Sequence, residues 1–465
     1  MTSPVIDPSN IRSSHRKGSI AILGLAIFLT VFLSAGAGRI LIPLFPLSTL
    51  VVGFFLYFQA PVLYVSFTWW MWFLAPVIRR MIDYQSGYLT PGPWTLVSTL
   101  VTFISVITLI KYLPRIKKQE AFPFILCSGA VFYGFFIGLI NNEASSSVLT
   151  FLGWINPILL GFHLYIHWER YPIYSRHLQK TFLWGVLVMG VYGLYQYFVA
   201  PEWDRFWLRS IEASSFGDPE PLGIRVCSTM DAPQPFAAVM MAGLILLFSN
   251  NENLRFASMA TGYLAFLLSL ARSAWLNWAA SFLILFPSLK SALQLRLVIT
   301  ILLALILILP VASIEPFSTV INSRLESFTN TSTDTSYQDR SRGYMELMGD
   351  ALTELTGKGL GMSINSNSIG SRDSGILSIL FSLGWFGTIP YIAGIILLFL
   401  KLFQGSESRF DSVASTSRAI ALGTFLQIGF NIIFEGSIGI VLWGFLGVGL
   451  AAHRYYLHQS QLISN

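Results

Sequence analysis

The run from Ser374 to Leu400 reads SGILSILFSLGWFGTIPYIAGIILLFL and contains no charged residue. An apolar run of about 20 residues is long enough to cross the hydrocarbon core of a bilayer as a helix. A helix is favoured there because it pairs its own backbone N–H and C=O groups where no water is present. This run therefore predicts a membrane-spanning helix.

Similar runs recur along the chain, and about fourteen of them meet the length criterion. They lie near residues 18–37, 40–59, 61–78, 94–113, 121–140, 147–167, 181–199, 234–249, 256–270, 273–287, 297–313, 374–401, 418–433 and 436–452. Pro43, Pro46 and Pro61 fall in the second and third runs, which form either separate spans or a re-entrant hairpin. The predicted fold class is an all-α polytopic membrane protein with about 12–14 transmembrane helices.

The composition supports this class. Hydrophobic residues make up 54% of the 465-residue chain and charged residues 11%, with a mean hydropathy of +0.63. Soluble proteins carry about 25% charged residues, so an ordinary soluble domain is excluded. The net charge of +6 comes from Lys and Arg residues that lie mostly in short loops, which predicts no nucleic-acid partner. The two cysteines, Cys127 and Cys227, predict neither a disulfide framework nor a metal site.

The basic clusters predict the orientation of the chain. Clusters near 111–118, 170–180, 290–296 and 401–418 fall on one side if the spans alternate from a cytoplasmic N-terminus. Both termini are then cytoplasmic, and the expected location is the bacterial inner membrane. The predicted parts are an N-terminal helix bundle at 1–312 with a periplasmic loop at 201–234, a large periplasmic loop at 313–373, and C-terminal spans with a cytoplasmic tail at 374–465.

The large loop contains a helical pattern. Its apolar residues recur at spacings of three and four: Tyr344, Leu347, Met348, Ala351, Leu352 and Leu355. Gly357, Gly359 and Gly361 follow and are typical of a helix end. We expect an amphipathic helix that covers the periplasmic face of the bundle, because a solvated linker has no need of an apolar stripe.

Several arginines depart from the tendency of basic residues to lie on the cytoplasmic side of the membrane. Those predicted on the periplasmic side or at its membrane edge are Arg39, Arg79, Arg80, Arg225, Arg272, Arg340 and Arg342. Placing an arginine within a span costs roughly 2.5–3.5 kcal/mol, so such a residue usually faces a cavity or a partner. For Arg39 and Arg80 we favour snorkelling to lipid headgroups or pairing with a carboxylate. Binding of an anion is favoured for Arg225 and Arg272, and the two interpretations are balanced for Arg79.

Four motifs together resemble the O-antigen ligase and polymerase family, and the resemblance runs from about Arg79 to Gly387. They are Gly193-Leu194-Tyr195-Gln196 before Pro201 and Trp203-Asp204; Gly223-Ile224-Arg225-Val226 with Ala232-Pro233; Leu270-Ala271-Arg272-Ser273-Ala274-Trp275; and Asp334-x-Ser336-x-x-x-Arg340-x-x-x-Tyr344 with Gly359-x-Gly361. The family continues with a His-Asn pair that opens the next span. Asp373-Ser374 stands at that place here, which fits a polymerase better than a ligase.

The resemblance implies a glycosyltransferase that polymerises or transfers undecaprenyl-diphosphate-linked oligosaccharide units at the periplasmic face. Arg225 and Arg272, with Arg79 as a further candidate, would bind the lipid diphosphate. The catalytic residues would be Asp373, as the base for the acceptor hydroxyl, and Arg340, as a third candidate for stabilising the departing diphosphate. Asp373 is equally well explained as a helix N-cap, and both interpretations stay open.

The same resemblance implies the partners. They are the lipid-linked oligosaccharide donor and acceptor, membrane lipid, and proteins of polysaccharide export and chain-length control. No residue cluster requires a metal, and no cofactor is expected. The alternative function is a transporter or channel component for a small anion such as bicarbonate. A transporter should carry paired ionisable residues near the bilayer midplane, whereas the charges here lie near the ends of the runs.

Overall fold

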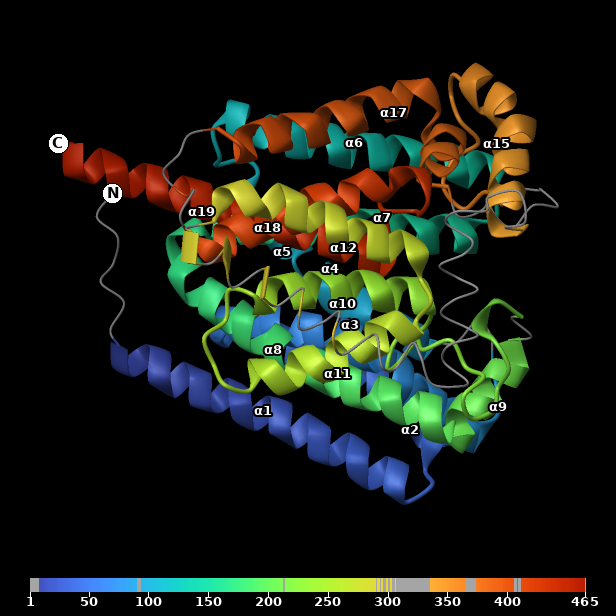
Figure 1. Ribbon diagram of the computed structural model, residues 1–465. Helices are drawn as coiled ribbons and strands as arrows, with labels where there is room; N and C mark the ends of the chain where they lie inside the picture. The colour runs from blue at the N-terminus through green and yellow to red at the C-terminus, as the bar shows by residue number, and fades with distance from the viewer. Residues whose placement is uncertain are drawn as a thin grey trace. The chain divides into compact units, whose positions relative to one another are not determined.

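The computed structural model describes residues 8–89, 93–211, 214–289, scattered positions between 291 and 306, 335–363, 374–404, 408 and 411–464. Within these ranges the regular structure is helical, apart from one isolated antiparallel bridge between Gly217 and Ile224. Among the described residues, eight helices are long and apolar enough to cross a membrane (Figure 1). The chain is therefore a multi-pass, all-α membrane protein, and the predicted fold class is confirmed.

The eight long helices coincide with eight of the predicted runs. They are α1 (Pro8–Ser34), α2 (Gly38–Gln59), α3 (Pro61–Ser86), α6 (Lys118–Asn141), α7 (Ala144–Ile166), α8 (Tyr171–Val199), α17 (Gly375–Leu402) and α19 (Gly436–Ser464). Pro43 and Pro46 lie inside α2, and Pro61 is the first residue of α3, where the missing N–H costs nothing. Because α2 and α3 are each long and apolar enough to span a membrane, two separate spans are favoured over a re-entrant hairpin.

Five other runs form shorter helices. These are α4 (Val97–Phe103) with α5 (Val106–Tyr112), α10 (Pro233–Leu247), α11 (Arg255–Leu268), α12 (Arg272–Leu285) and α18 (Ser412–Leu426). The longest of them has 15 residues, less than a helix needs to cross the hydrocarbon core unaided. The run near 297–313 falls mostly outside the described residues. Whether each short helix completes a crossing stays a prediction.

Two compact units share the chain, and each is assembled from separate segments. Unit 1 comprises Met1–Ser105, Pro172–Phe236 and Glu252–Ser269, and unit 2 comprises Val106–Tyr171, Ala237–Asn251 and Leu270–Asn465. Unit 1 also contains the short polar helix α9 (Glu202–Ile211), which contacts α3. The predicted parts 1–312, 313–373 and 374–465 were defined by the side of the membrane on which each loop lies. The division into two compact units does not test them.

The amphipathic helix predicted in the large loop is present as α15 (Thr335–Thr353), which packs on α17 in unit 2. Ala351 is fully buried, and Tyr344, Leu347 and Met348 are half-buried, so the stripe faces protein over its first two turns. The side chains of Leu352 and Leu355 are exposed, although the Leu352 and Leu355 carbonyls accept hydrogen bonds from Trp385 and Phe386 of α17.

The glycines after α15 are inserted into a break in α17. The α17 backbone is non-helical at Gly384, and the carbonyls of Phe381 and Ser382 accept hydrogen bonds from Lys358 N (2.6 Å) and Gly359 N (3.1 Å). A side chain on Gly359 would collide with the α6 backbone at Gly138, and its φ of +86° also favours glycine. Irregular backbone in a membrane protein is tolerated where protein groups pair it, as they do here.

Candidate functional site

An ion pair between Arg80 and Asp204 forms the centre of unit 1. Arg80 Nη1 lies 2.7 Å from Asp204 Oδ1, and the two side chains are 1% and 0% exposed. Arg80 comes from the last third of α3 and Asp204 from the first turn of α9. A charged pair out of reach of water is stable only if further hydrogen bonds satisfy both groups.

The network around this pair supplies most of those bonds and leaves Arg80 Nε without a hydrogen-bond partner. Asp204 Oδ2 accepts hydrogen bonds from Gln196 Nε2 (2.8 Å) and Tyr192 Oη (3.1 Å), both on α8. Burial raises the pKa of the Asp204 carboxyl, and the Arg80 charge and these two donors act in the opposite direction. Arg80 also donates to the Ser228 carbonyl and lies 5.7 Å from the centre of the Trp207 ring. The predicted pairing of Arg80 with a carboxylate is confirmed, and it occurs inside the protein.

The network fixes an extended segment that carries Arg225. Gln196 Oε1 accepts from both Cys227 N (3.0 Å) and Ser228 N (2.8 Å), so one side chain bridges the ion pair and this backbone. Gly193, one turn earlier on α8, lets the segment approach, since a Cβ there would lie 2.9 Å from Val226. Ser228 has a φ of +53°, a conformation that costs about 1–3 kcal/mol and persists only where the surroundings impose it.

Arg225 is half-buried, and its guanidinium contacts the backbone. Nη1 donates to the Ser215 carbonyl (2.7 Å) and Nε to the Ser269 carbonyl (3.3 Å). Both acceptors belong to unit 1, so this side chain joins the loop before the segment to the end of α11. The predicted role of Arg225 in diphosphate binding stays a prediction, and a structural role now stands beside it.

Arg79 is held by a carboxylate of its own helix. Its Nε lies 3.3 Å from Asp83 Oδ2, and its side chain is 18% exposed while that of Asp83 is buried. Asp231, just before α10, is exposed, and its carboxyl is close enough to Arg79 and Arg80 for their charges to act on it. Unit 1 therefore holds a carboxylate near Arg79 that the sequence analysis did not select.

Unit 2 contains a second polar region, where two helices begin against one turn. Arg272 is the first residue of α12, and Leu270 before it has a φ of +52°. The neighbouring Ser273 Oγ lies 3.5 Å from Asn431 Nδ2, which also bonds Gln427 Oε1 at 2.6 Å. Residues 427–431 thus form a turn at the N-terminus of α12, where the helix dipole favours negative charge.

The start of α17 contacts the same turn. A Cβ on Gly375 would lie 2.6 Å from the Asn431 carbonyl, so only glycine allows this approach. Ser374 is the N-cap of α17, and its Oγ accepts from Leu377 N at 3.2 Å. The capping interpretation of Asp373 is therefore wrong, because the next residue occupies the cap. Asp373 itself lies outside the described residues.

Helix α15 joins this junction through Tyr344. Its hydroxyl bonds Ser374 Oγ (2.7 Å) and donates to the Gly429 carbonyl (2.7 Å). Arg340 lies on the same helix one turn before Tyr344, and its side chain is outside the described residues. The region where α12 and α17 begin is called the start junction, and it comprises Ser273, Tyr344, Ser374, Gly375 and the turn 427–431.

Four of the five predicted site residues fall in two groups, and the fifth, Asp373, lies outside the described residues. Arg79 and Arg225 belong to unit 1, and both have identified partners there. Arg272 and Arg340 belong to unit 2, where sequence neighbours of Arg272, Arg340 and Asp373 meet at the start junction. Three segments far apart in sequence are thereby gathered by contacts of Ser273, Tyr344 and Ser374.

Glu435 lies in unit 2 just before α19 and is half-buried. Burial raises the pKa of its carboxyl to about 7, against a hydrogen bond from the Trp154 side chain that lowers it. A carboxyl with this pKa changes its charge near neutral pH. Among the described residues, no group of three or more His, Cys, Asp or Glu side chains is arranged to hold a metal ion.

The polar residues that hold these regions together were not predicted from the sequence. Gln196 and Asp204 were quoted as motif residues, but no role was assigned to them. Asn431 and Gln427 are amide side chains in an apolar run, and polar side chains in such a place are a usable signal of buried partners. Tyr344 was assigned to the apolar stripe, which its ring fits, whereas its hydroxyl makes the contact that matters here.

Comparison of the chain with protein-family models, with curated proteins and with solved structures gives no match in any of the three. The class of protein accordingly rests on the fold: a multi-pass membrane protein whose described residues include a buried ion-pair network and a polar junction where helices begin.

Proposed function

We propose that the chain is an inner-membrane glycosyltransferase of the O-antigen ligase and polymerase type. It would act on undecaprenyl-diphosphate-linked oligosaccharides at the periplasmic face, during synthesis of a surface or extracellular polysaccharide. The proposal rests first on the ordered motifs from Arg79 to Gly387. The observation that supports it best is the start junction, where neighbours of Arg272, Arg340 and Asp373 meet.

The chemistry of such a transfer assigns a task to each residue. The bond between the sugar's anomeric carbon and the donor diphosphate breaks, and its electron pair leaves with the lipid diphosphate. A new bond forms to the acceptor hydroxyl oxygen, and that hydroxyl proton passes to a base. Arg272 and the N-terminus of α12 would stabilise the departing negative charge, with Arg225 and Arg79 as further candidates. Asp373 would accept the proton and Arg340 would orient the reacting groups.

The proposal requires the large loop to be periplasmic. Reporter fusions at Lys117, Arg176 and Lys290 should then give cytoplasmic signals, and fusions near Ser215 and Asn330 should give periplasmic ones. A cytoplasmic signal at Asn330 would contradict the proposed orientation and the mechanism with it.

Complementation of a deletion strain tests the function directly. The deletion should shorten or abolish surface polysaccharide on a gel, and the wild-type chain should restore it. Asp373→Asn should reach the membrane at a normal level but lower the polymer yield about 10²–10⁴-fold, the usual loss for a general base. Asp350→Asn, an exposed carboxylate on α15, is the matched control and should restore polymer.

Two outcomes would contradict the proposal. If the deletion leaves polysaccharide unchanged and lowers uptake of an anion such as bicarbonate, the transporter function is favoured. If Asp373→Asn makes polymer of normal length at the normal rate, the base is another group, and Asp334 and Asp339 are the next to test.

A further inference from the structure

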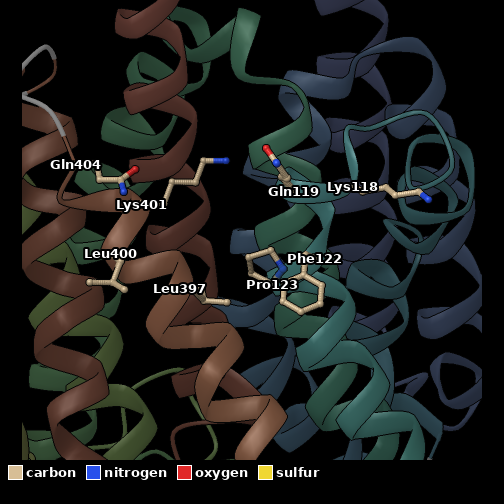
Figure 2. A pocket seen from close by; sticks show the side chains of 8 residues that line it. All are labelled: Lys118, Gln119, Phe122, Pro123, Leu397, Leu400, Lys401 and Gln404. Atoms are coloured by element: carbon tan, nitrogen blue, oxygen red, sulfur yellow. The ribbon is translucent and has the colours of Figure 1, made fainter.

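A groove lies between the first turns of α6 and the last turns of α17, both in unit 2 (Figure 2). It has a volume of about 470 Å³. Its polar residues are Lys118 and Gln119 on α6 with Lys401 and Gln404 on α17. The groove is at the opposite end of α17 from the start junction, some 40 Å away along a helix of this length. It is therefore separate from the candidate catalytic region.

The position of Gly394 on α17 explains where the groove opens. The two helices touch at Gly394, where a Cβ would lie 2.7 Å from the Pro123 carbonyl and 2.5 Å from Cys127 Sγ. Beyond Gly394 towards the end of α17 the helices are separated by larger side chains. Leu397, Leu400, Lys401 and Gln404 follow at spacings of three and four, so they share one face of α17.

The walls of the groove are apolar and open to the outside of the bundle. Phe122 is 51% exposed, Leu397 37% and Leu400 58%, on helices of membrane-spanning length. In a membrane such side chains face acyl chains. An occupant therefore needs a hydrocarbon part that lies along these walls and a polar part at the lysine end.

Lys401 supplies positive charge in excess of the nearby carboxylate, because Glu120 attracts both Lys401 and Arg454. The nearest acidic candidate is Glu120, but Arg454 Nη1 pairs with it at 2.7 Å. Lys401 Nζ instead donates to the neutral Tyr165 hydroxyl at 2.8 Å, and no ion pair to Lys401 occurs among the described residues. Because Tyr165 is buried, the contact holds the half-buried ammonium at a fixed place.

The polar groups are arranged for a headgroup with both charge and hydroxyls. Figure 2 shows Lys401 and Gln119 extending towards each other across the opening, while the Lys118 ammonium extends outward. An ammonium suits a phosphate oxygen, and an amide can donate to or accept from a hydroxyl. The exposed Lys118 adds positive potential at the mouth of the groove.

We infer that this groove is a binding site for an anionic phospholipid of the phosphatidylglycerol type. The phosphate lies against Lys401, the glycerol hydroxyls against Gln119 and Gln404, and one acyl chain along Phe122, Leu397 and Leu400. Basic pockets between membrane helices bind anionic lipid headgroups by this combination of charge and apolar wall. The inference does not depend on the proposed enzymatic function.

Lipid titration of the purified full-length chain tests the site. The delipidated protein in detergent is titrated with phosphatidylglycerol or with phosphatidylcholine of the same acyl chains, and bound lipids are counted by native mass spectrometry. The wild type should prefer phosphatidylglycerol. Lys401→Gln should weaken that binding about fivefold, the effect of one basic residue near an anionic lipid, and Lys401→Arg should restore it.

Two further variants separate this site from general surface charge. Lys111→Gln removes an exposed lysine at the end of α5, outside the groove, and should leave binding unchanged. Leu397→Trp keeps the charges but fills the groove, so it should weaken binding of phosphatidylglycerol even if Lys401→Gln folds poorly. The inference is overturned if the wild type binds both lipids equally, if Lys401→Gln and Lys111→Gln behave alike, or if Leu397→Trp binds as the wild type does.

Discussion

The buried network of unit 1 and the start junction of unit 2 are both polar regions in an apolar protein, but they are built differently. In unit 1 a full positive charge meets a full negative charge, and Gln196, Tyr192 and the Ser228 carbonyl supply further hydrogen bonds, although Arg80 Nε has none. In unit 2 the identified contacts at the start junction join hydroxyls, amides and backbone carbonyls, all neutral.

This difference indicates different tasks. A closed ion pair with 0–1% exposure cannot bind a substrate without breaking, so the Arg80–Asp204 network serves the fold. A neutral junction at the N-termini of two helices keeps a positive potential that an incoming anion can use.

Arg80→Met should cause the largest loss of stability. It leaves Asp204 as a buried charge without its partner, which typically costs about 3–5 kcal/mol of unfolding free energy. Thermal unfolding in detergent and the protein level in membranes measure this loss. Combining it with Asp204→Leu should recover part of the loss, because no buried charge remains. Arg205→Gln breaks an exposed pair with Glu220 in the same unit and should change little. Normal stability of Arg80→Met would mean that this network does not hold unit 1 together.

Glu435→Gln should change how stability depends on pH. Because burial raises the folded-state pKa from 4.5 to about 7, the folded protein binds more protons between these values, and stability falls as pH rises through this window. The total loss is roughly 2–4 kcal/mol, reached above pH 7. Glutamine stays neutral, so the variant should have a flat profile and be the more stable form above pH 7. Parallel wild-type and variant curves of thermal midpoint against pH would contradict the raised pKa.

Arg272→Lys tests whether the proposed diphosphate site beside the start junction needs a planar guanidinium. Lysine keeps the charge but loses the paired donors that match a phosphate group. Losing one charge-assisted hydrogen bond costs about 1.5–3 kcal/mol, so polymer formation should fall roughly 10- to 150-fold. Polymer on gels is compared with the amount of protein in the membrane. Arg39→Lys at the exposed start of α2 is the matched control, and equal polymer from both variants would argue against a diphosphate site at Arg272.

Ser374→Ala should have the smallest effect. It removes the cap of α17 and one partner of Tyr344, and losing a cap costs about 0.5–2 kcal/mol. Thermal unfolding should show a modest decrease. Ser374→Asp restores a capping acceptor and should recover most of it. If Ser374→Ala is as stable as the wild type, the start of α17 is held by the Gly375 contact and not by its cap.

Much of the fold was predictable because it depends on local properties. Length and hydropathy alone identified the eight long helices, and a three-and-four spacing identified α15 with the glycines that follow it. Part of the candidate site was also predictable, since the motifs that resemble a known family contain Arg225, Arg272, Gln196 and Asp204. The contacts of these residues could not be predicted, because a motif gives the order of residues along the chain and not the direction of their side chains.

The amino-acid sequence by itself determined that this chain is a helical membrane protein, because the need to pair every backbone group in lipid leaves few alternatives to apolar helices. Only the tertiary structure decided that Arg80 pairs with Asp204 and that Ser374, one residue after Asp373, caps α17. It also decided that Lys401 keeps a neutral partner beside an open groove. Those outcomes depend on how each helix is rotated about its axis and on close approach at Gly193, Gly375 and Gly394. Rotation and approach are set by segments far away in the sequence, so no local pattern specifies them.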